Sequence, residues 1–129
     1  MAYKILVVDD DKDIVDILQN RLVREGYLAA VAYDGEEALQ KVKEENPDVI
    51  ILDLMMPKRN GFEVLKEVRE KFKDKWRPII IVSAQDELES LEKCYDMQAD
   101  HYLTKPCDIN KVLRGIRTMI SLIPARKEE

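Results

Sequence analysis

Three carboxylates and one ammonium group come directly after apolar segments of this 129-residue chain. Asp9 and Asp10 follow the run ILVV, Asp53 follows VIIL, and Lys105 follows YLT. Such β-branched apolar runs are typical of strands that are buried on both faces of a parallel sheet. A charged residue at the carboxyl end of such a strand lies at the rim of the sheet, where packing does not explain it. We therefore interpret these four residues as one site.

Crowded carboxylates repel one another, and a divalent cation or an ammonium group relieves that repulsion. Mg²⁺ prefers hard oxygen ligands, among them one or two carboxylates and a phosphate oxygen. Asp9, Asp10 and Asp53 can supply the carboxylates, together with a backbone carbonyl from the loop after Asp53, which we assign to Met55. The charges of three carboxylates, Mg²⁺ and Lys105 add up to zero. The predicted site is therefore suited to receiving a phosphoryl group.

Asp53 is the candidate nucleophile, because it stands alone at its strand end and is followed by Leu54. Its carboxylate can attack phosphorus and form an acyl phosphate. The metal and Lys105 would hold the equatorial oxygens, since phosphoryl transfer depends mostly on positioning and charge neutralisation. Ser83 follows the run IIIV and can donate a hydroxyl hydrogen bond to the same phosphoryl group.

Alternating strands and helices are predicted to position these residues. Strands are expected at 4–8, 28–32, 49–52, 79–82 and 101–104, and helices at 12–25, after Asp34 up to Pro47, around Leu65, Val68 and Phe72, at 87–97, and from Asp108 to Pro124. This alternation predicts an α/β domain with a doubly wound parallel sheet and helices on both faces. In the strand order 2-1-3-4-5, ligands bind between the first and third strands, where Asp9, Asp10 and Asp53 stand.

Composition excludes several other classes of protein. The net charge of −5 does not support a nucleic-acid surface, and no apolar run approaches the roughly 20 residues of a membrane helix. One His and two Cys leave no His/Cys metal cluster, and no signal peptide is recognisable, so we expect a cytoplasmic protein. We expect one domain over residues 1–124 and a frayed tail over 125–129.

From about Lys4 to Leu122 the chain resembles the receiver domains of bacterial two-component response regulators, such as the single-domain chemotaxis and sporulation regulators. The matching residues are Asp9, Asp10, Asp53, Pro57, Gly61, Ser83, Ala84, Tyr102, Lys105 and Pro106. The resemblance implies a flavodoxin-like (βα)5 fold with Mg²⁺ as cofactor. It also implies a cis peptide bond between Lys105 and Pro106, since cis bonds occur almost only before proline.

The resemblance implies a signalling switch, and no enzyme beyond its own phosphorylation and dephosphorylation. Asp53 would receive phosphate from the phosphohistidine of a sensor histidine kinase or histidine phosphotransfer protein. Ser83 would then move toward the phosphate and Tyr102 would turn inward, changing the face formed by the fourth helix, fifth strand and fifth helix. That face would serve a downstream protein target or a phosphorylation-dependent homodimer. Met55 and Gln85 would tune the lifetime of the phosphate.

Two positions depart from the family pattern. Gln98 stands where receivers commonly have glycine after the fourth helix, and a left-handed conformation there costs Gln roughly 1 kcal/mol more than Gly. Cys107 stands where an aromatic residue is frequent after Lys-Pro.

Three other functions remain open. The chain could be the receiver part of a longer DNA-binding response regulator, or a receiver that is never phosphorylated and acts only as an interaction module. It could also be a Mg²⁺-dependent phosphohydrolase with an aspartyl-phosphate intermediate. The haloacid dehalogenase family carries Asp-x-Asp for that reaction, and here the second position is Met55.

Overall fold

The computed structural model describes residues 2–56, 58–84 and 88–127, the side chain of Leu88 excepted. Its strands are β1 (Lys4–Val8), β2 (Leu28–Ala32), β3 (Val49–Leu52), β4 (Ile79–Ser83) and β5 (His101–Thr104). Its helices are α1 (Lys12–Arg24), α2 (Gly35–Glu45), α3 (Gly61–Lys66), the π-helical turn η1 (Glu67–Lys71), α4 (Leu88–Asp96) and α5 (Ile109–Lys127). None of the helices described is both long and apolar enough to cross a membrane.

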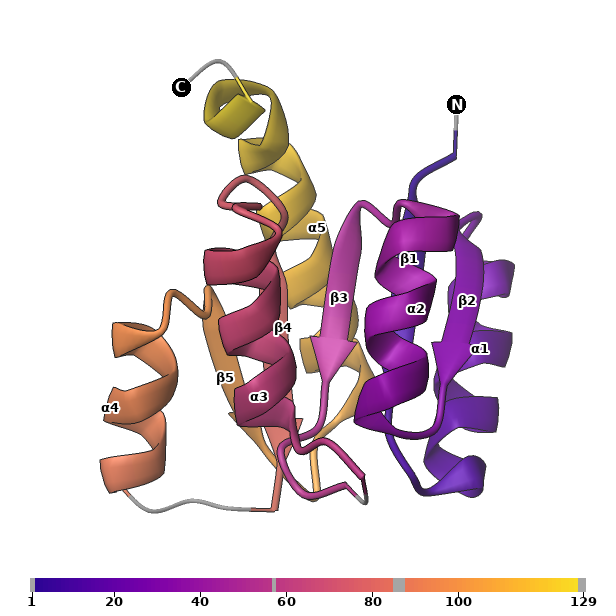
Figure 1. Ribbon diagram of the computed structural model, residues 1–129. Helices are drawn as coiled ribbons and strands as arrows, with labels where there is room; N and C mark the ends of the chain where they lie inside the picture. The colour runs from indigo at the N-terminus through magenta and orange to yellow at the C-terminus, as the bar shows by residue number, and fades with distance from the viewer. Residues whose placement is uncertain (1, 57, 85–87, 128–129) are drawn as a thin grey trace.

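The five strands form one parallel sheet in the order β2-β1-β3-β4-β5, which confirms the predicted fold class and topology. The register places Val8 of β1 beside Leu52 of β3, so the residues that follow them leave the sheet at the same edge. In the pair formed by β4 and β5, Ser83 lies beside Thr104. All the strands therefore deliver their carboxyl ends to one edge, at the bottom of Figure 1.

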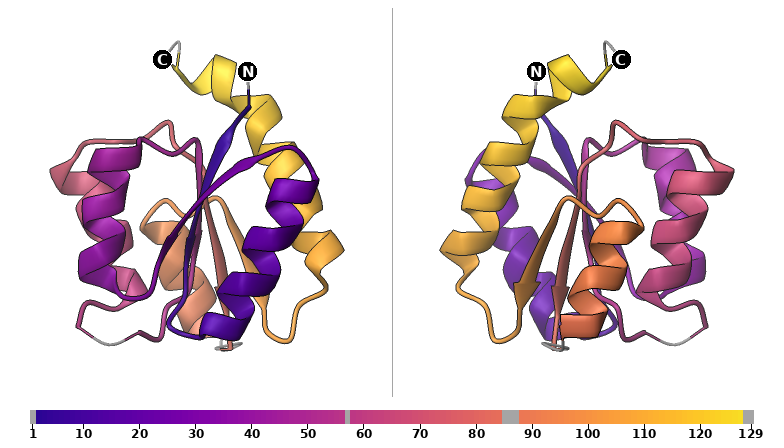
Figure 2. Two further views of the ribbon diagram at one scale, coloured as in Figure 1. Left: turned by 90° about the vertical axis from the view of Figure 1, so that its right-hand side faces the viewer. Right: turned by 90° about the vertical axis from the view of Figure 1, so that its left-hand side faces the viewer.

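Helices cover both faces of the sheet. Figure 2 shows α1 and α5 on one side and α2, α3 and α4 on the other. Alternate residues of the central strands enter the two layers: Ile50 packs in the layer under α2, α3 and α4, and Ile51 in the layer under α1 and α5. Because both faces are buried, every residue of β3 is apolar, which explains why the strand was recognisable from its sequence.

Helix α5 does not end at Pro124, which corrects our prediction, but continues through it to Lys127. Proline removes one backbone N–H and crowds the preceding turn, so its cost in a helix has to be offset elsewhere. Here Arg126 ties the last turn to the body of the domain: its guanidinium lies 2.7 Å from Asp100 Oδ1 and donates to the Lys75 carbonyl at 2.8 Å. Residues 125–127, which we expected in a frayed tail, are therefore helical.

The third helix also differs from a regular α-helix. After Lys66 it widens into η1, and the Phe72 N–H donates to the Glu67 carbonyl, five residues back, at 2.9 Å. Leu65 and Val68 of the predicted apolar stripe are buried, and Phe72 packs against the same core layer at its margin.

Gln98 does adopt the left-handed conformation, with φ of 68°. The buried Arg69 guanidinium fixes this turn, because its Nε donates to the Gln98 carbonyl at 3.0 Å and its Nη2 to Asp100 Oδ2 at 2.9 Å. Asp100 in turn accepts from the Ile79 N–H at 2.8 Å, which joins the turn to the start of β4. Gln98 takes part through its backbone carbonyl and Asp100 through its carboxylate, while the Gln98 side chain is exposed.

We predict that Gln98→Gly raises the free energy of unfolding by roughly 0.5–1 kcal/mol, because glycine adopts positive φ without the steric cost of a Cβ. Urea denaturation measures the effect. Gln40→Gly is the control, since Gln40 is exposed in the regular helix α2. Its substitution should lower the free energy of unfolding by about 1 kcal/mol, because glycine is a poor helix former. Equal destabilisation by both substitutions would show that the turn imposes no strain on Gln98.

Candidate functional site

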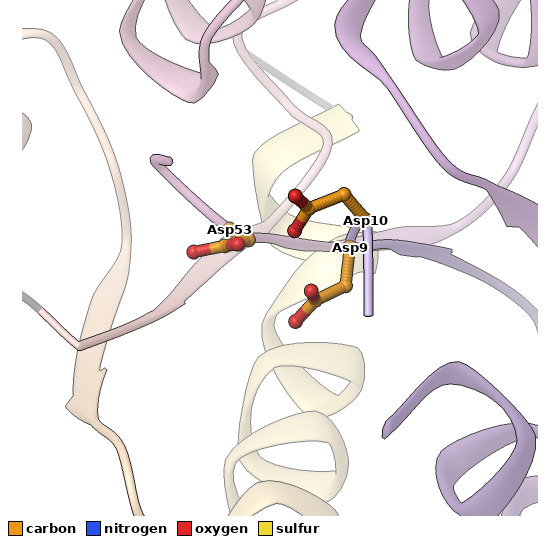
Figure 3. A group of neighbouring side chains, drawn as sticks. All are labelled: Asp9, Asp10 and Asp53. Atoms are coloured by element: carbon orange, nitrogen blue, oxygen red, sulfur yellow. The ribbon is translucent and has the colours of Figure 1, made fainter. Parts of the chain in front are cut away.

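The end of β1 provides two carboxylates with different surroundings. Asp9 is only 4% exposed, whereas Asp10 is exposed. The Asp9 N–H donates to the Ala32 carbonyl at 3.1 Å, which continues the pairing with β2 past the strand end. Asp9 Oδ1 accepts from the Asp11 N–H at 2.9 Å, so one of its oxygens is already engaged locally. Figure 3 shows both side chains beside that of Asp53.

Asp53 follows β3 and is 5% exposed. Its N–H donates to the Val8 carbonyl at 3.0 Å, which places it next to the end of β1. Its Oδ1 accepts a long hydrogen bond from the Met55 N–H at 3.4 Å. Gly61 closes the loop that follows: its N–H donates to the Leu54 carbonyl at 2.9 Å, and a Cβ at Gly61 would lie 2.3 Å from the Asp53 carbonyl oxygen. Only glycine permits this close approach.

Lys105 brings a positively charged ammonium group to the site from the end of β5. Its Nζ lies 2.7 Å from Asp9 Oδ2 and 3.6 Å from Asp53 Oδ2, so the two carboxylates share it unequally. The Lys105 N–H donates to the Ser83 carbonyl at 2.8 Å, and the peptide bond between Lys105 and Pro106 is cis. The ends of β1, β3, β4 and β5 thus meet at this point.

Burial dominates the electrostatics of Asp53. Burial and the neighbouring charge of Asp9 raise the pKa of Asp53 from its ordinary value of 3.8 to about 6, although Lys105 and the Met55 N–H oppose the shift. For Lys105, burial disfavours the ammonium form, but the hydrogen bond with Asp9 and the charge of Asp53 outweigh it and raise the pKa. Lys105 therefore stays charged at neutral pH, while Asp53 is a carboxylate that the fold stabilises poorly.

The three carboxylates fit a hard divalent cation. Asp9, Asp10 and Asp53 each offer an oxygen, and these oxygens lie within 4.8 Å of one another. The set consists of oxygen atoms only, which suits Mg²⁺, and the exposed Asp10 opens it to solvent. A cation here would also compensate the charge that Lys105 leaves unbalanced at Asp53.

The structure places the other predicted site residues around this cluster. Ser83 is the buried last residue of β4, and Met55 lies just beyond Asp53 with a side chain that is 58% exposed. Tyr102 is 8% exposed in the core layer under α2, α3 and α4, so its ring already lies inward. Two predicted residues, Pro57 and Gln85, lie outside the described residues.

One contact beside the site was missed in the sequence. Gly35, the first residue of α2, packs against the Arg59 carbonyl in the loop after β3. The available signal was a glycine directly after the capping residue Asp34, because glycine is a poor helix former and needs a local reason there.

Comparison with known proteins gives one consistent result. The family model for the response regulator receiver domain matches residues 5–117. A Francisella response regulator receiver domain is 35% identical, with a TM-score of 0.86 over 92% of this chain and 97% of that one. A CheY-like receiver domain protein from Methanospirillum hungatei is 27% identical, with a TM-score of 0.91 over 100% of both chains. The chemotaxis protein CheY4 of Vibrio cholerae is 32% identical, with a TM-score of 0.86 over 92% of this chain and 99% of that one.

The raised pKa of Asp53 predicts that Asp53→Asn stabilises the metal-free protein at neutral and alkaline pH. The folded wild type holds this proton more tightly than the unfolded chain does, so its stability falls as pH rises from 3.8 through about 6. Asparagine cannot ionise, so the variant does not lose stability in this way. We expect the free energy of unfolding of Asp53→Asn to exceed that of the wild type by about 1–3 kcal/mol at about pH 8. Denaturation in EDTA across pH measures the difference, which should vanish near about pH 4. A constant difference at all pH values would exclude titration of Asp53 as its cause.

Proposed function

The chain belongs to the response regulator receiver domain family, and from that premise we propose that it is the phosphoacceptor of a two-component phosphorelay. Receiver domains are signalling domains and are not generally classed as enzymes. The observation that carries the proposal is Asp53: a nearly buried carboxylate at the switch point of the sheet, 3.6 Å from a lysine ammonium and grouped with two further carboxylates. A cytoplasmic location is part of the same proposal and rests on family membership.

Asp9, Asp10 and Asp53 would hold Mg²⁺ with the backbone carbonyl of Met55. The cation, when bound, supplies Lewis-acid stabilisation of the charge on the phosphoryl oxygens. The chain's own residues do the rest. Lys105 already lies between two carboxylates with its Nζ protonated, and an ammonium at this place can donate to a phosphoryl oxygen.

Transfer begins with the Asp53 carboxylate in its charged form, which predominates above the raised pKa of about 6. A carboxylate oxygen attacks phosphorus of a phosphohistidine on a sensor kinase or phosphotransfer protein. The new P–O bond forms as the P–N bond breaks, and the imidazole of the donor leaves with the electron pair. The unfavourable burial of the charge on Asp53 favours the reaction, because the acyl phosphate moves that charge from the buried carboxylate to the phosphoryl oxygens, to which the Lys105 ammonium can donate.

Ser83 and Tyr102 are the residues proposed to report phosphorylation. Ser83 ends β4, and its carbonyl accepts from the Lys105 N–H, so the hydroxyl and the ammonium belong to adjoining strand ends. Because Tyr102 is already buried, the proposal requires a second arrangement with the ring turned outward. Phosphorylation would shift the population toward the inward arrangement, to which the face of α4, β5 and α5 responds. Met55, which is exposed next to Asp53, and Gln85 would set the lifetime of the phosphate.

We predict that wild-type protein incubated with acetyl phosphate or phosphoramidate gains the mass of one phosphoryl group only when Mg²⁺ is present. Asp53→Asn should gain nothing, since the nucleophile is absent, while its circular dichroism spectrum stays native. Intact mass spectrometry measures both.

A gain on Asp53→Asn would place the phosphoryl group elsewhere and contradict the assignment. No gain on wild type, combined with no change on adding beryllofluoride and Mg²⁺, would favour a receiver that acts only through its surface.

Lys105→Met should slow phosphorylation by acetyl phosphate about 100-fold at saturating Mg²⁺, the size expected for losing one charged donor to the phosphoryl group. The variant should bind Mg²⁺ at least as tightly as wild type, because Asp9 is freed from its ion pair. Calorimetric titration and intact mass give the two quantities. Lys111→Met, on the exposed side of α5, is the matched control and should change neither. Weaker Mg²⁺ binding by Lys105→Met would contradict the assigned role.

A further inference from the structure

The loop between β3 and α3 carries the Met55 carbonyl, and its two ends are fixed by the backbone. At one end the Asp53 N–H is held by Val8, and at the other the Gly61 N–H donates to the Leu54 carbonyl at 2.9 Å. The hydrogen bond between Gly61 and Leu54 therefore closes the loop at its base, beside the end of β3. Met55 directly follows this base, and residues 58–60 lead back to it at Gly61. What holds residues 58–60 in place therefore also limits where the Met55 carbonyl can lie.

The first turn of α2 supplies that support by direct contact with the loop backbone. A Cβ built on Gly35 would lie 2.0 Å from the Arg59 carbonyl oxygen and 2.6 Å from the Arg59 carbonyl carbon. No side-chain rotation relieves an overlap with backbone atoms, so any larger residue at position 35 has to displace the loop or the helix. The helix start itself is fixed, because Asp34 caps it through the Glu37 N–H at 2.8 Å.

Ion pairs hold the same part of the loop from both sides. Arg59 Nε lies 3.1 Å from Glu36 Oε1 on α2, and Arg59 Nη1 lies 2.7 Å from Glu67 Oε2 at the start of η1. Lys58, which has a φ of 65°, adds a contact of 3.4 Å to Asp34 Oδ2. Exposed pairs of this kind contribute little to global stability. Two of them on one guanidinium nevertheless connect Arg59 to two different elements, α2 and η1.

We propose that Gly35 and Arg59 are positioning residues for the Mg²⁺ site: the start of α2 is a backstop that keeps the β3–α3 loop, and with it the Met55 carbonyl, in place for the cation. This inference rests on the proposed function, because it assumes that Asp9, Asp10 and Asp53 bind Mg²⁺. Neither residue belongs to the carboxylate cluster, so both would act on the cation only through the loop.

Calorimetric titration of the unphosphorylated protein with Mg²⁺ tests the proposal directly, without using phosphorylation as the readout. Gly35→Ala should raise the dissociation constant about tenfold, as loss of a residue that orients a metal ligand does. Gly115→Ala is the matched control. Its added Cβ would meet only side chains, at 3.4 Å or more, and should leave the dissociation constant unchanged.

Arg59→Ala tests the same support without forcing atoms together, and it keeps the proposal testable should Gly35→Ala fail to fold. If charge alone matters, removing the positively charged Arg59 side chain from the surroundings of an acidic site strengthens Mg²⁺ binding. A loss of loop position instead weakens binding, by about threefold, the size of an exposed ion pair's contribution. The two explanations thus predict opposite signs, and Arg59→Lys should recover part of the wild-type affinity.

The phosphorylation rate separates positioning from a general loss of structure. At saturating Mg²⁺ the folded Gly35→Ala protein should react with acetyl phosphate at close to the wild-type rate, with only the half-saturating Mg²⁺ concentration raised. Unchanged Mg²⁺ affinity in folded Gly35→Ala, or equal or tighter binding by Arg59→Ala, would overturn the proposal. Absence of Mg²⁺ binding by wild type would instead refute the proposed function on which it rests.

Discussion

Asp9 and Asp53 are nearly buried carboxylates at the ends of adjacent strands, and the ammonium group of Lys105 is the cation that reaches both. It lies close to Asp9, at 2.7 Å, and farther from Asp53, at 3.6 Å. Among the residues that the structure describes, Asp9 accepts a backbone hydrogen bond of 2.9 Å, whereas the backbone hydrogen bond to the Asp53 carboxylate is longer, at 3.4 Å. The negative charge of Asp53, the residue proposed to react, is thus less well compensated than that of Asp9. Binding of a cation or transfer of a phosphoryl group at Asp53 would lower the electrostatic cost of this charge.

Such a site needs a scaffold that holds the repelling groups together, and the opposite edge of the sheet shows what holds it. There the buried Arg77 guanidinium donates to the Pro47 carbonyl and to Asn46 Oδ1, both at 2.6 Å, and pairs with Asp74. Arg69 joins the turn before β5 to the end of η1 in the same way, since its Nη1 donates to the Asp74 carbonyl at 2.8 Å. Buried charges at this edge are matched by several partners each, which is the condition under which burial of charge is tolerated. The sheet is therefore held by well-matched charges at one edge, whereas at the other edge Lys105 relieves the repulsion between carboxylates only in part.

The contrast between these edges also explains what could be predicted from the sequence. Strand positions and the acidic cluster were predictable because apolar runs such as that of β3 stop abruptly at a charge, and strand order then brings Asp9, Asp53 and Lys105 together. Arg69 and Arg77 gave no such signal, because an arginine within a helical segment or just before a strand looks like a surface residue until its distant partners are known. The course of α5 past Pro124 was mispredicted for the same reason, since Arg126 meets Asp100 26 residues away in sequence. The local pattern of apolar and charged residues thus predicts which helices and strands form, whereas contacts between polar groups distant in sequence determine where these elements end.

The unequal sharing of Lys105 also indicates how a local charge change can reach the rest of the domain. If Asp53 is phosphorylated as proposed, the phosphoryl group would offer Lys105 a stronger acceptor than Asp9 does and would draw the ammonium toward β3. The backbone of Lys105 is bonded to the Ser83 carbonyl, and Tyr102 lies three residues earlier on β5. Movement of the lysine would therefore act on the ends of β4 and β5 together, the strands that carry Ser83 and Tyr102. The ammonium is paired tightly with Asp9 and loosely with Asp53, so added charge on the Asp53 side would change its position. This change would connect phosphorylation to a second arrangement of the same surface.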